Sequence, residues 1–395
     1  MPRRRHLYTV TVVLAVLALS GFARLAQSSD LTSARGASFS SSASVVAVRR
    51  PATGSDCGPP VSYSIFEKNA YGSDWSKVDD LIAFNRIGSG GYYHIYTVRP
   101  DGSDLQQVGI GSATFPGRTT GSPAWSPSGA YMAFAAEETT RLPGDLAGDT
   151  FAATPGWGGY SDLWVSTANG SKAWRLTDLP SGVDDGVLLP QFSPNGRLLE
   201  WTQKLAGANG TVDWSVKVAQ FHLTAAGAPY LTNTQTVAPG GSAYPNEFVE
   251  TGGFSANSQE LLFTSDYQIH LFVESQIYEV NLQTGAITRL TKGYTYNEHP
   301  RFTPSGQIIW MTDTDQPLSH PGGDDWWIMN ADGSDPHKLT EFNTPTSPNY
   351  FGKTVYATVV NTDNWGTNGS SFYGDLELNL ISSRSDILRV SLTCG

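Results

Sequence analysis

The sequence has little of what most enzymes of its length carry. Its 395 residues include 2 cysteines, 4 methionines and 7 histidines. It contains no Gly-x-Ser-x-Gly elbow, phosphate-binding glycine loop, His-Glu-x-x-His pair or dinucleotide fingerprint. No segment after the first 25 residues has a helical period, and only one long apolar run occurs. These absences exclude the common hydrolase, nucleotide and metalloprotease motifs, and they exclude a helical fold.

The single apolar run lies at the N-terminus. Three arginines at 3–5 precede a charge-free stretch from Leu7 to Ala23, which is typical of an export signal. Cleavage after Ala23 and retention as an uncleaved membrane anchor both fit its length. Phe22 stands where a lipid-modified cysteine would be, so a lipoprotein is not expected. We therefore expect a signal peptide or signal anchor over 1–26, a disordered Ser/Ala-rich tether over 27–56, and a folded domain over 57–395.

The charge balance is acidic. Residues 1–26 hold four of the 25 basic residues and none of the 36 acidic ones, so the rest carries a formal charge of −15. This balance argues against nucleic acid and anionic membrane surfaces as partners. The cysteines, Cys57 and Cys394, stand at the two ends of the folded part. In an exported protein this placement predicts a disulfide joining the termini, and two unrelated buried thiols are the alternative.

Short strands and tight turns fill the remainder, consistent with 41 glycines, 23 prolines and 11% aromatic residues. A unit of aromatic-Ser-Pro-x-Gly, a short apolar strand, a second strand, an Asp-Gly turn and a Leu-Thr strand recurs along the chain. One unit is a small sheet that cannot bury its own faces, so it requires similar neighbours. The spacing predicts an all-β, six-bladed propeller of four-stranded blades. The aromatic anchors of the six expected copies are Trp75, Trp125, Phe192, Phe254, Phe302 and Tyr350.

The repeated unit resembles the WD40-like (PD40) repeat of TolB-type β-propellers, over about residues 60–395. The resemblance implies a monomeric propeller of the periplasm or the extracellular space. It leaves the role open, because such propellers serve as interaction modules, as non-catalytic partners of peptidase domains and as scaffolds of some sugar lyases.

Strand direction places all long insertions on one face of the propeller, which we call the loop-rich face. These insertions are expected at 88–93, 137–161, 204–213, 266–274, 313–324 and 361–374. They carry aromatic side chains beside acids, which suits a protein or glycan partner. The expected ligand-binding residues are Trp365, Trp157, Tyr160, Tyr93, Trp326, Asp324 and Asp325, with Trp365 expected to be the best exposed.

Histidines and acids also gather on this face. Glu298 and His299 lie where the chain enters an innermost strand, so they are expected at the mouth of the central channel, with His270 and His320 in nearby loops. Together they would form an acid/base or divalent-metal site, although no pair has a metal-ligand spacing. Solvated loop histidines are the alternative.

Two functions follow as hypotheses. The first is an extracytoplasmic, non-catalytic binding module without a cofactor, which presents the loop-rich face to a protein or glycan. The second is a sugar lyase or glycosidase that uses His299, His270, His320 and Glu298. The fold alone does not choose between them.

Overall fold

The computed structural model describes residues 57–88, 90–138, 152–315, 323–351, 357–365, 370–378 and 385–394. The expected signal segment and tether lie outside these ranges, as does His320. Within them, all strands belong to six four-stranded antiparallel sheets, with three short 3-10 turns as the only helices. None of the helices in this part of the chain is long and apolar enough to span a bilayer.

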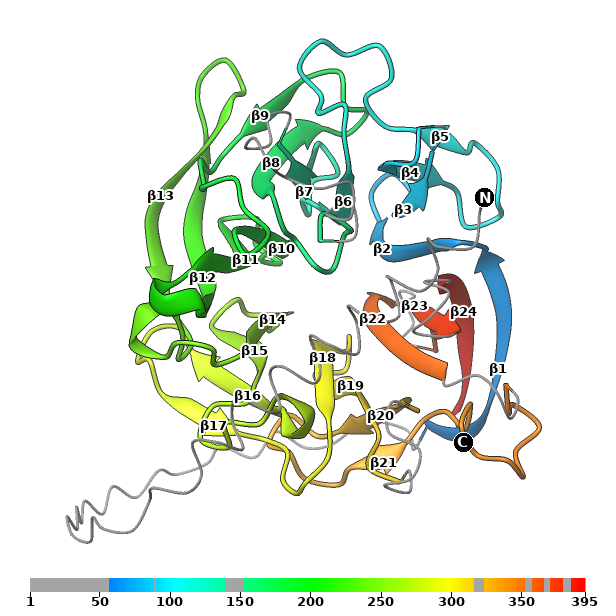
Figure 1. Cartoon of the computed structure of the whole chain (residues 1–395). Coiled ribbons are helices and arrows are strands. Elements are labelled where there is room, and N and C mark those ends of the chain that lie inside the picture. Colours follow the sequence, from blue (N-terminus) through cyan, green and yellow to red (C-terminus); the bar gives the residue numbers. More distant parts are fainter. Residues whose placement is uncertain are drawn as a thin grey trace, which may run out of the picture. The chain divides into compact units, whose positions relative to one another are not determined.

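The six sheets are the blades of a propeller, so the predicted fold class is confirmed (Figure 1). Blade 1 contains β2 (Ala70–Ser76), β3 (Leu81–Ile87), β4 (Tyr93–Val98) and β5 (Gln106–Gln107), and blade 2 contains β6 (Thr120–Trp125), β7 (Tyr131–Glu137), β8 (Ser161–Thr167) and β9 (Ala173–Arg175). Blade 3 contains β10 (Gly186–Phe192), β11 (Leu198–Ala206), β12 (Val212–Leu223) and β13 (Pro229–Thr236), and blade 4 contains β14 (Val249–Phe254), β15 (Glu260–Ser265), β16 (Gln276–Asn281) and β17 (Ile287–Arg289). Blade 5 contains β18 (Asn297–Phe302), β19 (Ile308–Thr312), β20 (Asp325–Met329) and β21 (His337–Lys338). The 3-10 turns are η1 (Ala208–Gly210), η2 (Gly241–Ala243) and η3 (Phe272–Glu274).

Blade 6 joins the two ends of the folded chain. Its inner strands are β22 (Ala357–Trp365), β23 (Ser371–Leu378) and β24 (Ser385–Cys394), and its outermost strand is β1 (Cys57–Glu67). β1 runs antiparallel to β24, and the Cα atoms of Cys57 and Cys394 are partners in this ladder. The ring is therefore closed by backbone hydrogen bonds between the first and last strands.

This closure corrects our assignment of the sixth repeat. The expected anchor Tyr350 precedes the innermost strand β22, and the aromatic residue that ends this strand is Trp365, which pairs with Phe372 of β23. Within the expected loop at 361–374, residues 361–365 belong to β22 and residues 371–374 to β23. The repeat was misread because its fourth strand comes from the other end of the chain.

The core is divided among the six contacts between neighbouring blades. Each contact has its own cluster of buried apolar side chains, such as Phe84 with Ile387 between blades 1 and 6 and Trp326 with Phe372 between blades 5 and 6. Each blade is thus stabilised on both faces by its neighbours, and the apolar surface is buried only when the ring is complete.

The repeated residues have local roles that explain their recurrence. The Ser or Thr after the aromatic anchor accepts a backbone N–H across the tight turn, as Ser193 does from Leu198 at 2.9 Å and Thr303 from Gln307 at 3.1 Å. The Thr of the Leu-Thr strand accepts the backbone N–H at the start of the third strand, as Thr340 does from Trp326 at 2.9 Å. These side chains satisfy backbone donors that the ladder leaves free.

Every innermost strand of blades 1–5 contains a bulge of one extra residue. The register shifts fall between 71 and 74, 121 and 124, 188 and 191, 251 and 254, and 298 and 301. In each bulge one residue has a positive φ, namely Gly72, Ser122, Leu189, Gly253 and His299. Such bulges redirect side chains, and here they do so around the central channel.

Gly72 tests the importance of the bulge. Its φ is +65°, an added Cβ would overlap the Asn85 side-chain amide, and its N–H donates to Asp375 Oδ2 of blade 6 at 2.6 Å. We expect Gly72→Ala to lower the free energy of unfolding by about 2–4 kcal/mol, from backbone strain and displacement of the neighbouring side chain.

The matched control is Gly102→Ala. Gly102 has a φ of +84° in a turn with open space around its Cα, so only the backbone term of about 1 kcal/mol applies. Urea denaturation of both variants measures the difference, and equal losses would show that the bulge adds nothing beyond ordinary strain.

Candidate functional site

The loop-rich end of the channel collects buried acids and a histidine from two blades. Glu250 lies on β14 of blade 4, and Glu298 and His299 lie on β18 of blade 5. The Nδ1 atom of His299 lies 3.4 Å from Glu250 Oε2, and its Nε2 atom lies 3.4 Å from Glu298 Oε2. Glu250 and Glu298 are buried, and His299 is half-buried. We call these three side chains the acid–histidine cluster.

The bulge of blade 5 brings His299 into this cluster. His299 has a φ of 50°, which is uncommon for a side chain of its size. In a regular strand, neighbouring side chains point to opposite faces, so His299 and Glu298 would be separated. The bulge breaks this alternation and allows both to meet Glu250 of the neighbouring blade.

Two polar atoms of the cluster, which lie 3.4 Å from each other, make no hydrogen bond within the described part of the chain. Among the described residues, Glu250 Oε2 and His299 Nδ1 are buried and make no hydrogen bond. Burying polar atoms without hydrogen bonds costs stability, so a ligand that bonded to them would stabilise this part of the fold.

Burial also shifts the protonation of the cluster. Burial raises the pKa of Glu298 to about 7. A hydrogen bond from the Tyr296 side chain has the opposite, smaller effect on this pKa. Burial, with the charge of Glu298, raises the pKa of Glu250 well above its usual range. Burial and the nearby Arg301 lower the pKa of His299 to about 3, so the imidazole is neutral at neutral pH. A neutral imidazole between two carboxyl groups can accept a proton or bind a metal ion.

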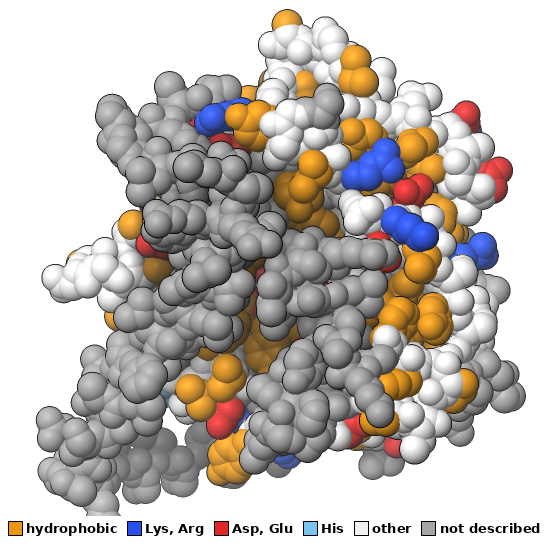
Figure 2. Space-filling view, turned by 45° about the vertical axis from the view of Figure 1, so that its right-hand side comes forward, with side chains coloured by type: hydrophobic (Ala, Val, Ile, Leu, Met, Phe, Trp, Pro, Cys, Tyr) orange, Lys and Arg blue, Asp and Glu red, His pale blue; other side chains and the backbone are white. Residues whose placement is uncertain are grey.

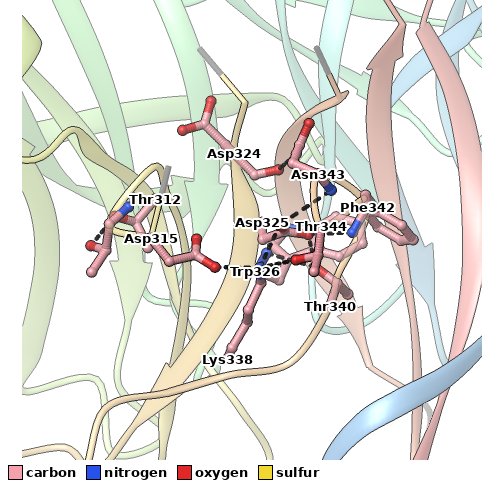
Figure 3. A network of polar contacts seen from close by, with 11 residues as sticks. Thr312, Asp315, Asp324, Asp325, Trp326, Lys338, Thr340, Phe342, Asn343 and Thr344 are labelled. Carbon is pink, nitrogen blue, oxygen red and sulfur yellow. Dashed lines mark hydrogen bonds and ion pairs between the residues drawn. The ribbon is translucent and has the colours of Figure 1, made fainter. Parts of the chain in front are cut away.

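Asp324 lies beside the cluster. It is 2% exposed, its Oδ1 has no hydrogen-bond partner among the described residues, and burial with the charges of Asp313 and Glu298 raises its pKa well above its usual range. Its carboxylate points away from Asp325 (Figure 3). Asp324 therefore adds a further buried carboxyl group to the same end of the channel.

Asp325 has a structural role. Its carboxylate accepts the Thr340 hydroxyl at 2.8 Å and the Phe342 N–H at 2.7 Å, and it pairs with Lys338 at 3.0 Å (Figure 3). It ties β20 to the segment after β21 and is fully buried. The prediction that Asp325 binds a ligand does not fit these contacts.

Most of the expected aromatic binding surface is also buried. Trp365, predicted to be the best exposed, is 6% exposed and packs on Phe372 because it is the aromatic anchor of blade 6. That prediction was wrong. The rings of Trp326 and Tyr160 are buried, and Tyr93 is half-buried against Tyr71. These four rings fill spaces within or between blades.

Trp157 remains exposed at 44%, on the segment that precedes β8. This segment, residues 152–160, contacts the innermost strand of blade 1, where the Tyr71 hydroxyl donates to the Pro155 carbonyl at 3.0 Å. Gly158 packs closely on Leu188 of blade 3. The segment thus borders blades 1–3, and the acid–histidine cluster lies on blades 4 and 5.

His270 lies outside the cluster. Its Nδ1 pairs with Glu247 Oε1, and its side chain is 65% exposed. The expectation that it joins His299 in one site is therefore not supported. Glu250 was missing from our prediction, although the repeat held a signal for it: Glu250 stands four residues before the anchor Phe254, as Glu298 does before Phe302.

A cavity of about 190 Å³ lies near the opposite end of the innermost strands, among residues at or near the aromatic anchors such as Asp74, Gln191 and Arg301. Arg301 lines this cavity and also influences Glu250 and His299 electrostatically. The cavity is distinct from the cluster, whose acids are not among its lining residues.

No family model matches the sequence, and no curated protein matches it. Among solved structures, the chain is similar to TolB from Acinetobacter baumannii, with 18% identity, 80% of this chain and 65% of that chain covered, and a TM-score of 0.44. The present chain is a six-bladed β-propeller, and the solved structures that it resembles are TolB and related propeller proteins. They include a puromycin-hydrolyzing peptidase from Mycobacterium tuberculosis, with 11% identity, 82% and 52% coverage and a TM-score of 0.40. The acylaminoacyl peptidase from Pyrococcus horikoshii has 11% identity, 78% and 43% coverage and a TM-score of 0.42. The chain thus spans about two thirds or less of the length of each, and the site must be judged on its own geometry.

The raised pKa of Glu298 predicts a pH-dependent stability. A carboxyl group protonated more readily in the folded state stabilises that state below its unfolded pKa, and this contribution is lost as the pH rises toward the folded value of about 7. With chelator present, we expect the free energy of unfolding to fall by about 2–3 kcal/mol between pH 4.5 and 8 through Glu298.

The Glu298→Gln variant removes the titrating proton and keeps the shape. Its urea unfolding profile is expected to lose that part of the slope. Parallel wild-type and variant profiles would show that Glu298 titrates normally.

Proposed function

We propose that this protein is an extracytoplasmic, non-catalytic binding module that takes a glycan at the loop-rich mouth of its central channel. The observation that supports the proposal is the acid–histidine cluster, in which Glu250 Oε2 and His299 Nδ1 are buried without a hydrogen bond among the described residues. Loops of the same face carry exposed aromatic side chains. Carboxylates accept hydrogen bonds from sugar hydroxyls, and aromatic rings stack on the apolar faces of sugars.

The aromatic side chains on the rim are Trp157 and Tyr294. Tyr294, 84% exposed, lies in the link between β17 and β18, two residues before Tyr296, which hydrogen-bonds Glu298. On the described part of the face in Figure 2, hydrophobic side chains form several groups separated by polar and charged ones. This mixed surface favours recognition at a polar site over docking on one broad apolar face.

A glycan array checks the proposal directly. We expect Trp157→Ala and Tyr294→Ala to weaken retained glycans by about three- to tenfold, since each removes a stacking ring worth about 1 kcal/mol. Tyr230→Ala is the control, because Tyr230 is 43% exposed but lies on the outer strand β13.

All three variants should melt at the wild-type temperature, because the rings are exposed. Glycan profiles that stay unchanged in Trp157→Ala and Tyr294→Ala would contradict the proposal, as would equal losses in Tyr230→Ala.

A sugar lyase or glycosidase is the second candidate, favoured by the 3.4 Å approach of His299 to both acids and by the raised pKa of Glu298. Incubation of the retained glycans with the protein separates the two functions. New reducing or unsaturated ends that disappear in Glu298→Gln would establish the enzyme, and intact glycans support the binding module.

An extracytoplasmic location would allow a disulfide to form, and we propose one between Cys57 and Cys394. Directly opposed residues of an antiparallel pair have Cα atoms about 4.5–5.5 Å apart, which lies within the range that a disulfide spans. The bond would lock β1 to β24 and stabilise the closed ring by about 2–4 kcal/mol.

Intact-mass analysis of the exported protein under non-reducing conditions is expected to find no free thiol, and a reductant should lower its melting temperature. The Cys57→Ser/Cys394→Ser double variant should melt at the reduced value with or without reductant. Two titratable thiols in the exported protein would refute the disulfide.

A further inference from the structure

The acid–histidine cluster has the donor set and spacing of a metal centre. Glu250, Glu298 and His299 each offer one ligand atom, and these atoms all lie within 4.8 Å of one another. Ligands that bind a metal at 2.0–2.1 Å in a tetrahedral site lie about 3.4 Å apart. Each ring nitrogen of His299 lies 3.4 Å from one carboxylate oxygen, so whichever nitrogen binds the ion has one carboxylate at this spacing. We propose that Glu250, Glu298 and His299 bind a divalent transition-metal ion at the mouth of the central channel.

The lack of hydrogen bonds at two of these atoms supports this assignment. Glu250 is 4% exposed, yet its Oε2 makes no hydrogen bond among the described residues, and neither does His299 Nδ1. A bound cation would satisfy both atoms. Only one ring nitrogen of His299 can bind the same ion, so one carboxylate must rotate toward the metal-bound nitrogen.

The donor set indicates the kind of metal. One imidazole with two carboxylates suits Zn²⁺ or Mn²⁺, whereas Ca²⁺ prefers six to eight oxygen ligands. Arg301 limits the affinity, because its positive charge acts on both Glu250 and His299. With three protein ligands, further coordination positions remain for water or a ligand hydroxyl.

This inference deepens the proposed function, since a metal ion at the channel mouth could bind sugar hydroxyls, but the metal site can be tested without any glycan. Calorimetric titration of the full chain, freed of metal by a chelator, is carried out with ZnCl₂, MnCl₂ and CaCl₂. We expect one equivalent of Zn²⁺ or Mn²⁺ to bind and to raise the melting temperature, with at least tenfold weaker binding of Ca²⁺.

The variants are chosen to keep the fold. Glu250→Gln and Glu298→Gln preserve side-chain shape, and His299→Asn places at φ 50° a residue that tolerates the left-handed region. Each should weaken Zn²⁺ or Mn²⁺ binding at least tenfold. His270→Asn is the matched control, because His270 also has a positive φ, of 62°, and pairs with a glutamate outside the cluster.

The proposal is overturned if the wild type binds no Zn²⁺ or Mn²⁺, if all three cluster variants retain binding, or if His270→Asn loses it equally. Glycan binding measured with chelator present separates the two proposals. If glycans are retained but no metal binds, only the proposed metal site is contradicted. If metal binds but no glycan is retained, only the proposed glycan binding is contradicted.

Discussion

Closure of the ring is the constraint on which the rest of the structure depends. Each four-stranded blade buries its apolar faces only against its neighbours, and the core consists of six separate clusters between blades. The pairing of β1 with β24 completes the last blade, so a strand from the start of the folded chain holds the cores on both sides of blade 6. Only a closed ring fixes the innermost strands around one channel, and only then do side chains of neighbouring blades meet there.

The bulges in the innermost strands determine which side chains meet at the channel mouth. Their backbone N–H groups are held by side chains of the preceding blade, as Ser122 N is by Asn85 Oδ1 at 3.0 Å and Thr251 N by Thr202 Oγ1 at 2.8 Å. In blade 5 the bulge residue with a positive φ is His299, and the bulge brings its imidazole next to the carboxyl groups of Glu250 and Glu298. What distinguishes blade 5 among the bulges is the chemistry of the side chain at this position, an imidazole that faces carboxyl groups of two strands.

The sequence predicted the fold well because its signals are local and repeated. The Ser-Pro-x-Gly turns and Leu-Thr strands recur since each satisfies a specific backbone donor, so five anchors were placed correctly. The sixth was misplaced because β1 supplies its outer strand from far away in the sequence, and the motif at Trp365 lacks the Ser-Pro pair. For the site, strand direction brought Glu298 and His299 to the channel mouth, but no pattern within one repeat shows which side chain of the next blade faces them. Burial of Trp365, Trp326 and Tyr160 also depends on contacts between blades, which composition does not reveal.

The proposed metal site at the channel mouth is built from side chains of two blades. The most direct test is anomalous scattering from crystals of the full chain soaked in MnCl₂ or ZnCl₂. One strong peak is expected in contact with side-chain atoms of Glu250, Glu298 and His299, at about 2.0–2.2 Å from each ligand atom. A map without a peak between these side chains, or with its strongest peak at His270 and Glu247, would contradict it.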